Sequence, residues 1–192
     1  MAYGTLAELK KVVGIPADDT DDDARLSSVL AAASESIDRY CGRTFEPYNT
    51  SSSAPRVFRA TRSCAEVDTD DFVKDDDTIV ETGYRRNGPW TALEADDWDV
   101  LWAADRATDP HVGIWIVRPF DGWVRITARW GWTLNTPADI IEAALLLAAR
   151  LYKRADAPFG VTGSGDLGVV QVRPWDPDVI RILGLYRKRK VG

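Results

Sequence analysis

Residues 122–154 read GWVRITARWGWTLNTPADIIEAALLLAARLYKR, and the spacing of apolar residues changes within this stretch. From Val124 to Trp130 apolar and polar residues alternate, which predicts a β-strand with one buried face. After Thr136 the apolar residues no longer alternate and follow one another almost without interruption. One strand therefore leads directly into one long helix, and this junction predicts an α+β fold.

The predicted helix covers residues 137–153. Thr136 and Asp139 have the spacing of a capping box, and Pro137 suits the first helical position. A helix that is apolar nearly all round is buried on most of its sides. Two kinds of neighbour could cover it, namely other elements of the same chain or another subunit. Periodicity alone leaves both alternatives open.

Three further helices are predicted over residues 5–13, 22–41 and 177–187. In the second of them the apolar residues recur at i, i+3, i+4 and i+7 and form a single stripe that includes Cys41. Gly42 follows this stripe and is placed to end the helix in the left-handed conformation. We expect a buried, unreactive thiol at Cys41.

The region between about residues 55 and 132 has short segments rich in β-branched and aromatic residues, separated by Asp, Gly and Pro. Such segments are typical of antiparallel strands. We expect residues 113–130 to form a hairpin that turns at Asp121 and Gly122. The predicted architecture is a helical assembly body with an inserted antiparallel β subdomain. The expected divisions are 1–54 for the N-terminal helical part, 55–132 for the β subdomain and 133–192 for the C-terminal helical part.

Composition and motifs exclude several classes of function. A net charge of −6 argues against broad electrostatic binding to nucleic acid or to anionic membranes. Two cysteines and one histidine are too few for a zinc site. A cysteine–histidine nucleophile would have to recruit His111, which we expect at a turn. The acidic run at residues 18–23 places the wrong residues at the last position of a calcium-binding loop. The glycine-rich match at residues 163–168 lacks the helix that a dinucleotide fingerprint requires. We therefore predict no enzyme activity, no metal, no cofactor and no membrane association.

Tryptophan is abundant in the strand region, and two interpretations of this remain open. A row of rings on one face of a sheet would suit a carbohydrate-binding β module, whereas rings on the inner face would form a core. The tryptophans in question are Trp90, Trp98, Trp102, Trp115, Trp123, Trp130 and Trp132.

The last predicted helix has an apolar stripe and is followed by four consecutive cations. The stripe consists of Val179, Ile182, Leu183 and Tyr186. The cations are Arg187, Lys188, Arg189 and Lys190. A basic tail on an acidic protein can serve solubility, or it can dock on an acidic surface.

Two stretches together resemble the head–tail connector (adaptor) proteins of tailed bacteriophages, particularly those of actinobacterial siphoviruses. The first is AAASESIDRYCGRTF, residues 31–45. The second is GWTLNTPADIIEAALLLAARLYKRADAPFGVTGSGDLGVVQVRPWDPDVIRILGLYRKR, residues 131–189.

The resemblance implies a structural protein of the virion that is made in the bacterial cytoplasm and acts at the capsid vertex. Members of the family form a homo-oligomeric ring, usually of twelve copies, under the portal protein. A downstream stopper or connector protein binds the opposite side, and double-stranded DNA passes without sequence-specific binding.

The resemblance also implies two sets of contact residues. The expected portal-docking residues are Val179, Ile182, Leu183, Tyr186, Arg187, Lys188, Arg189 and Lys190. The expected subunit-interface residues are Ile141, Leu145, Leu147, Leu151 and Arg43. For Arg43, packing at the end of a helix is the alternative interpretation.

Overall fold

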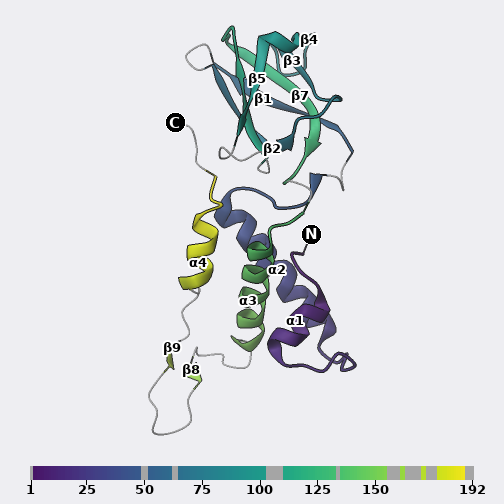
Figure 1. Cartoon of the computed structure of the whole chain (residues 1–192), viewed down its shortest axis with the longest axis vertical. Helices are drawn as coiled ribbons and strands as arrows, with labels where there is room; N and C mark the ends of the chain where they lie inside the picture. The colour runs from purple at the N-terminus through teal and green to yellow at the C-terminus, as the bar shows by residue number, and fades with distance from the viewer. Residues whose placement is uncertain are drawn as a thin grey trace. The chain divides into compact units, whose positions relative to one another are not determined.

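Within the residues that it describes, the computed structural model has four α-helices, one short 3-10 helix and two antiparallel sheets, so the predicted α+β class is confirmed (Figure 1). The structure describes residues 2–48, 52–61, 65–102, 110–132, 135–154, 161–162, 170–171 and 177–188. The helices are α1 (Leu6–Val13), α2 (Asp23–Cys41), α3 (Ala138–Arg154), α4 (Pro177–Gly184) and the short 3-10 helix η2 (Ala95–Asp97). The strands are β1 (Ala54–Ala60), β2 (Glu66–Val73), β3 (Ile79–Gly83), β4 (Thr91–Ala92), β5 (Trp98–Trp102), β6 (His111–Ile116), β7 (Gly122–Trp130), β8 (Val161–Thr162) and β9 (Val170–Gln171).

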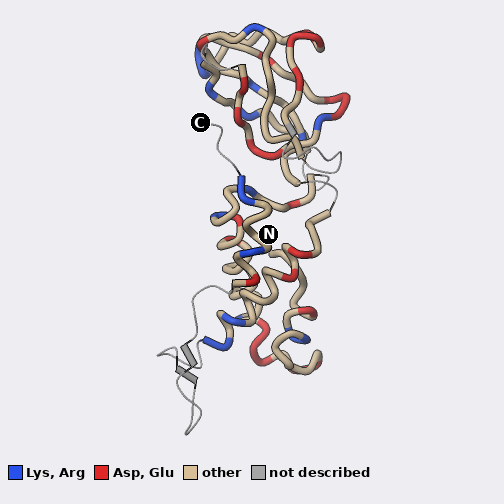
Figure 2. Tube along the Cα trace, turned by 60° about the vertical axis from the view of Figure 1, so that its left-hand side comes forward, with Lys and Arg blue, Asp and Glu red and all other residues tan. Residues whose placement is uncertain are grey.

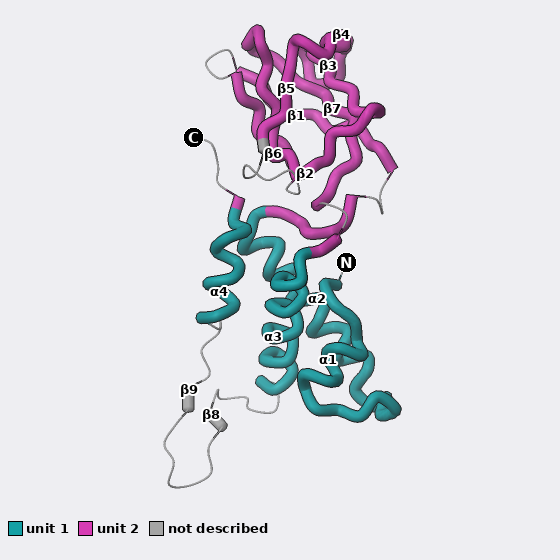
Figure 3. The backbone as a smooth tube through the Cα atoms, in the orientation of Figure 1, with its two compact units in different colours: residues 1–42, 137–187 teal, residues 43–136, 188–192 magenta. Residues whose placement is uncertain are grey.

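The chain forms two compact units, which Figure 3 shows in different colours. Unit 1 contains residues 1–42 and 137–187, and unit 2 contains residues 43–136 and 188–192. Unit 1 holds the four α-helices, and unit 2 holds the sheet made by β1 to β7. The glycine-rich match at residues 163–168 lies outside the described residues.

In unit 1, α3 is the central helix and packs against α1, α2 and α4. These helices of the same chain cover most of the apolar surface of α3, so another subunit is not needed to bury it. Polar contacts fix the position of α3 on α2. The Tyr152 hydroxyl donates a hydrogen bond to Asp22, and Arg25 lies over the Tyr152 ring with its guanidinium carbon 4.4 Å from the centroid.

The helix ends in unit 1 follow from local sequence. Thr5 and Glu8 form a reciprocal capping box at the start of α1. Gly42 ends α2 in the left-handed conformation at φ 68°, and its N–H bonds the Asp38 carbonyl, so the prediction for Gly42 is confirmed. The side chains of Thr136 and Asp139 do not form the expected capping box, because each bonds elsewhere. The Thr136 hydroxyl donates to the Phe45 carbonyl at 2.8 Å, and Asp139 accepts from a tyrosine of α4.

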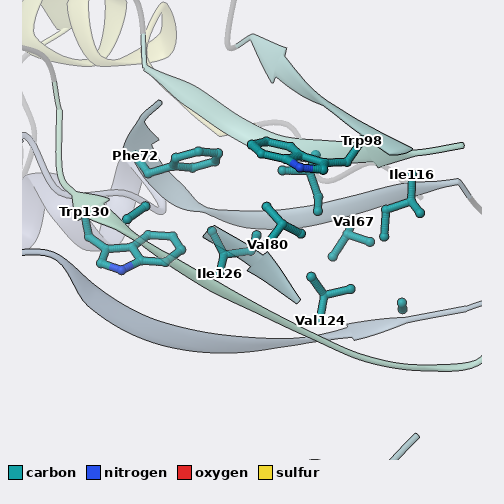
Figure 4. Close-up of a cluster of buried hydrophobic side chains, with 11 residues drawn as sticks. Val67, Phe72, Val80, Trp98, Ile116, Val124, Ile126 and Trp130 are labelled. Carbon is teal, nitrogen blue, oxygen red and sulfur yellow. The ribbon is translucent and has the colours of Figure 1, made fainter. Parts of the chain in front are cut away.

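In unit 2, the path through the sheet runs β4-β3-β7-β2-β6-β5, and β1 also pairs with β7. β7 is the longest strand and alternates between buried and half-buried residues along its whole length, as its sequence predicts. The buried residues of β7 face a core that receives side chains from most other strands. Figure 4 shows these side chains directed toward one another from several strands. The labelled members are Val67, Phe72, Val80, Trp98, Ile116, Val124, Ile126 and Trp130.

The predicted hairpin over residues 113–130 is wrong. β6 and β7 are consecutive in the chain, but they do not pair, because β2 lies between them and bonds to both. The connection that follows Ile116 contains Pro119 and is longer than a tight turn, so it allows the chain to cross to another position in the sheet.

β2 is the longest of the strands that the sequence did not predict. Its sequence, EVDTDDFV, contains three aspartates, and aspartate is depleted in strands. In the sheet, Val67 and Phe72 face the core, while Asp68 and Asp70 lie exposed. The strand is therefore held by its two neighbours and by its buried side chains rather than by local propensity.

Candidate subunit and partner interfaces

The α4 stripe, expected to dock on the portal, is divided between core and surface. Val179 and Leu183 have no exposed area and belong to the core of unit 1. Ile182 and Tyr186 are half-buried. The Tyr186 hydroxyl donates to both carboxylate oxygens of Asp139, each at 2.8 Å, which ties the end of α4 to the start of α3. The thiol of the buried Cys41 lies 3.8 Å from the Leu183 carbonyl, in agreement with the inert thiol that was predicted.

The outer side of α4 exposes apolar residues that the sequence analysis did not single out. Ile180 is 40% exposed, and Leu185, which follows the helix, is 83% exposed. Ile180 directly follows Val179, and Leu185 lies two residues after Leu183, so the exposed residues point away from the buried side of α4. Arg187 is exposed, and its guanidinium carbon lies 6.0 Å from the Tyr40 ring centroid.

Among the four cations of the tail, Lys188 belongs to unit 2, where its Nζ donates to the Thr69 carbonyl. Arg189 and Lys190 lie outside the described residues. The structure therefore gives Lys188 a contact within its own chain, in addition to any that it makes with a partner.

The predicted subunit-interface residues of α3 differ in their exposure. Leu145 and Leu147 are each 5% exposed and contribute to the core of unit 1. Ile141 and Leu151 are half-buried. Leu146 lies between the two buried leucines in the sequence and is 37% exposed, but it was not among the predicted interface residues. Contact with another subunit is thus open to Ile141, Leu146 and Leu151, whereas the other two leucines serve the fold.

Arg43 follows Gly42 and lies in unit 2 with its side chain only 7% exposed. Its Nε is 3.6 Å from Oδ2 of Asp71, and its guanidinium carbon is 5.2 Å from the Trp132 ring centroid. A separation of 3.6 Å allows an ion pair but exceeds hydrogen-bond distance. Arg43 is therefore held between a carboxylate and an aromatic ring of unit 2, rather than by the carbonyl groups at the end of α2. Whether it also touches another subunit stays a prediction.

The Asp71 carboxylate is 2% exposed, and burial raises its pKa above the ordinary value. The positive charges of Arg43 and Lys188 oppose this rise, while Asp70 adds to it. Attraction to the two cations thus does not fully offset the loss of hydration, as is common for buried ion pairs.

The tryptophans of unit 2 do not form a row of open rings in the part of the chain that the structure describes. Trp98, Trp130 and Trp132 are 5–7% exposed and belong to buried clusters, whereas Trp90 and Trp123 are half-buried beneath arginines. The core interpretation explains most of these residues, and the carbohydrate alternative gains no support. The side chain of Trp102 lies outside the described residues.

The outward face of β1, β7 and β3 places arginines on aromatic rings. The guanidinium carbons of Arg59 and Arg86 lie 5.5 Å and 5.7 Å from the Trp123 ring centroid. Arg125 lies 5.0 Å from the Trp90 centroid. These distances are in the range of cation–π contacts. We call this surface the basic face, and it consists of Arg59, Arg86, Trp90, Trp123 and Arg125.

The outward face of β2, β6 and β5 has the opposite charge. Glu66, Trp115 and Asp99 lie opposite one another across the three strands, and Asp68 is two residues from Glu66 on the same side. The three carboxylates are exposed, and Trp115 and Val117 are 40% and 43% exposed. We call this surface the acidic face, and it consists of Glu66, Asp68, Asp99, Trp115 and Val117. The sequence could have revealed it only if β2 had been recognised as a strand.

Two further features bear on function. Within the described residues, His, Cys, Asp and Glu form no group of three or more that could hold a metal ion. Among the described helices, none is long and apolar enough to cross a membrane. His111, expected at a turn, begins β6 and is 6% exposed, and burial lowers its pKa, with the Lys74 charge acting in the same direction.

The fold resembles chains of solved gene transfer agent particles. A chain from a structure described as "Neck of empty GTA particle computed with C6 symmetry" matches with a TM-score of 0.59 and 19% sequence identity, covering 98% of this chain and 91% of that chain. A chain from "Virion of native gene transfer agent (GTA) particle" matches over the same shares with a TM-score of 0.55 and 19% identity. At this identity the likeness establishes the fold alone.

A comparison with curated proteins gave no match. The model of the family described as "Phage gp6-like head-tail connector protein" matches residues 3–78, which comprise α1, α2, β1 and β2. This segment includes the first of the two stretches on which the resemblance was based. The resemblance to head–tail connectors is thereby confirmed for this segment: residues 3–78 are similar to the Phage gp6-like head-tail connector proteins, whereas the actinobacterial siphovirus type stays a prediction.

Proposed function

We propose that this protein is a structural, non-enzymatic connector of a tailed-phage-like virion, located at the head–tail interface. The match of residues 3–78 to the head–tail connector family carries this proposal. The likeness to a neck chain supports it, because the shared fold extends over 98% of this chain and thus includes both units.

In the proposed arrangement, copies of the chain form a ring under the portal, and double-stranded DNA passes through its lumen. The similar chain comes from a neck computed with six-fold symmetry, and a ring of twelve copies is compatible with such an axis. A net charge of −6 suits a channel that must release DNA rather than hold it. A stopper or further connector protein would occupy the side of the ring that faces the tail.

The proposed portal contact is the outer side of α4 together with the basic tail. Val179 and Leu183 stabilise unit 1 and are not free to bind a partner in this conformation. Ile180 and Leu185 expose the apolar area that a partner could bury. The tail cations would add attraction to an acidic portal rim.

A mass measurement tests the ring. We expect the full-length chain, mixed with its portal, to give a particle that exceeds the portal by an integer multiple of the 21.3 kDa subunit. Mass photometry of the chain alone, of the portal alone and of the mixture gives this number directly. A chain that keeps the mass of one subunit both alone and with portal contradicts the proposal.

The basic tail can be tested by replacing Arg187, Lys188, Arg189 and Lys190 with serine. We expect roughly tenfold weaker portal binding at low salt and a smaller difference at about 1 M salt, because salt screens exposed charges. Portal binding is measured by biolayer interferometry over a salt series. As a matched control, Lys11, Arg39, Lys153 and Arg154, exposed cations on other helices, are replaced by serine. Equal losses in both variants would show that only net charge matters and that the tail is not the docking element.

A further inference from the structure

The basic face and the acidic face of unit 2 have complementary charge, and the proposed portal contact uses neither of them. We propose that the basic face of one copy of this chain docks on the acidic face of the next copy. This inference rests on the proposed ring, and it assigns one subunit contact of that ring to the sheet of unit 2.

The carboxylates of the acidic face have no cationic partner in the part of the chain that the structure describes. Within the described residues, no lysine or arginine lies within ion-pair distance of Glu66, Asp68 or Asp99. The neighbouring Asp70 differs, because Arg56 lies 2.6 Å from its carboxylate. Three unpaired carboxylates around an exposed tryptophan ring therefore form a surface that favours a cationic, partly apolar partner.

The basic face has two arginines whose positive charges are not paired with a carboxylate in the described part of the chain. Arg125 is neutralised by Glu81, to whose two carboxylate oxygens it donates at 2.5 Å and 2.6 Å. Arg59 and Arg86 have no carboxylate within ion-pair distance in the described part of the chain. Both lie on the Trp123 ring, which holds their charges at fixed positions. Figure 2 shows both signs of charge on unit 2, with Asp and Glu in longer continuous segments than Lys and Arg.

The tryptophans and arginines of the two faces are residue types that are frequent in protein–protein interfaces. Arginine and tryptophan are enriched where protein interfaces are most strongly bound. On the acidic face, Trp115 and Val117 supply apolar area that a second copy would remove from water. On the basic face, the arginines are positioned to form charge-assisted hydrogen bonds with carboxylates.

The two faces belong to different strands, and this determines the symmetry of the contact. A two-fold dimer through either face would bring like charges together, which is costly. A contact between unlike faces leaves one free basic face and one free acidic face on the pair as a whole, so the contact continues from copy to copy and closes into a ring when the rotation allows. The charge pattern thus favours a ring over a symmetric dimer.

Nucleic acid is the other polyanion that arginines could attract. Affinity for DNA depends on the number of phosphates that are neutralised, with six to ten contacts typical of a strong site. Only Arg59 and Arg86 on the basic face have an uncompensated charge, and the chain as a whole is acidic. A second copy of the chain, with its three unpaired carboxylates, matches this face better.

Charge exchange tests the proposal. One variant carries Arg59→Glu and Arg86→Glu, a second carries Glu66→Lys and Asp68→Lys, and a third combines all four substitutions. We expect each double variant to associate about 100-fold more weakly than the wild type, in line with the loss of several close charge pairs. An equimolar mixture of the two double variants regains assembly, and so does the fourfold variant alone, because opposite charges again face each other.

Assembly is measured by mass photometry with and without portal, and circular dichroism with thermal unfolding confirms that every variant is folded. Arg39→Glu combined with Lys153→Glu in unit 1 changes net charge as much as the first variant and should assemble like the wild type. If this control loses assembly, or if the mixture is not rescued, the face-to-face contact is wrong.

Two outcomes separate this inference from the proposed function. A wild type that forms rings, with double variants that form them equally well, overturns the contact and leaves the ring. If the wild-type protein remains a single subunit both in isolation and in the presence of portal, the proposed ring and the proposed contact are both wrong. Fluorescence anisotropy with a 30-base-pair duplex covers the remaining alternative. Normal assembly of the first variant with lost duplex binding would assign the basic face to DNA and overturn the proposal.

Discussion

Replacing Leu183 with alanine should lower the free energy of unfolding of unit 1 by about 2–5 kcal/mol, the range found for leucine-to-alanine changes in cores. Leu183 has no exposed area, and its carbonyl and neighbouring side chains contact α2 and α3. The substitution removes one methine and two methyl groups and leaves a cavity between helices that are distant in sequence. Urea unfolding followed by circular dichroism at 222 nm measures the change.

Leu185→Ala is the matched control, because it removes the same atoms two residues later. Leu185 is 83% exposed, and substitutions at such positions usually change stability by less than about 0.5 kcal/mol. Portal binding should show the reverse order, with the larger loss for Leu185→Ala. If the two variants had equal unfolding free energies, α4 would not be packed on unit 1 as the structure shows.

Replacing Arg43 with methionine should destabilise the protein by about 3–5 kcal/mol at pH 7, the cost of leaving one member of a buried ion pair without its partner. Asp71 would then keep a buried negative charge with only Lys188 nearby. Arg43→Met combined with Asp71→Leu removes both charges and should recover most of this loss. Chemical unfolding of the single and double variants gives the coupling between the two residues.

The pH dependence of Arg43→Met follows from the raised pKa of Asp71. A carboxyl with a folded-state pKa above its unfolded value stabilises the fold most below the unfolded pKa, and this contribution is lost as pH rises through the folded pKa. The deficit of Arg43→Met relative to the double variant should therefore shrink as pH falls from 7 through the raised pKa of Asp71 toward its ordinary value of 3.8. A deficit that is constant over this range would show that Asp71 is not the destabilising charge. Exposed Arg39, paired with Glu35 on α2, serves as the control, and Arg39→Met should cost at most about 0.5 kcal/mol.

Local sequence determined the features that depend on neighbours along the chain. The alternation in β7 and the position of Gly42 were both predictable. A strand of period two and a left-handed helix end each have a sequence pattern that spans only a few residues. The α+β class follows from the same patterns, since the change in period is visible in one continuous stretch. The resemblance of the N-terminal segment to head–tail connectors could likewise be recognised from a short motif.

Pairing and burial required the tertiary structure. β6 and β7 have the sequence of a hairpin, yet β2 separates them, because the strand order depends on which inner faces fill a common core. β2 was not predicted because its aspartates oppose strand formation locally. In the folded protein Asp68 and Asp70 face solvent, and the buried Asp71 lies beside Arg43.

The candidate interfaces show the same division. The sequence by itself determined that α3 and α4 are apolar and that arginines accompany tryptophans on β7. Only the tertiary structure decided that Leu183 is core while Leu185 is surface, and that Arg59 and Arg86 meet on Trp123. The physical reason is that periodicity shows which residues share a face of an element, whereas the neighbour that covers this face comes from distant parts of the chain.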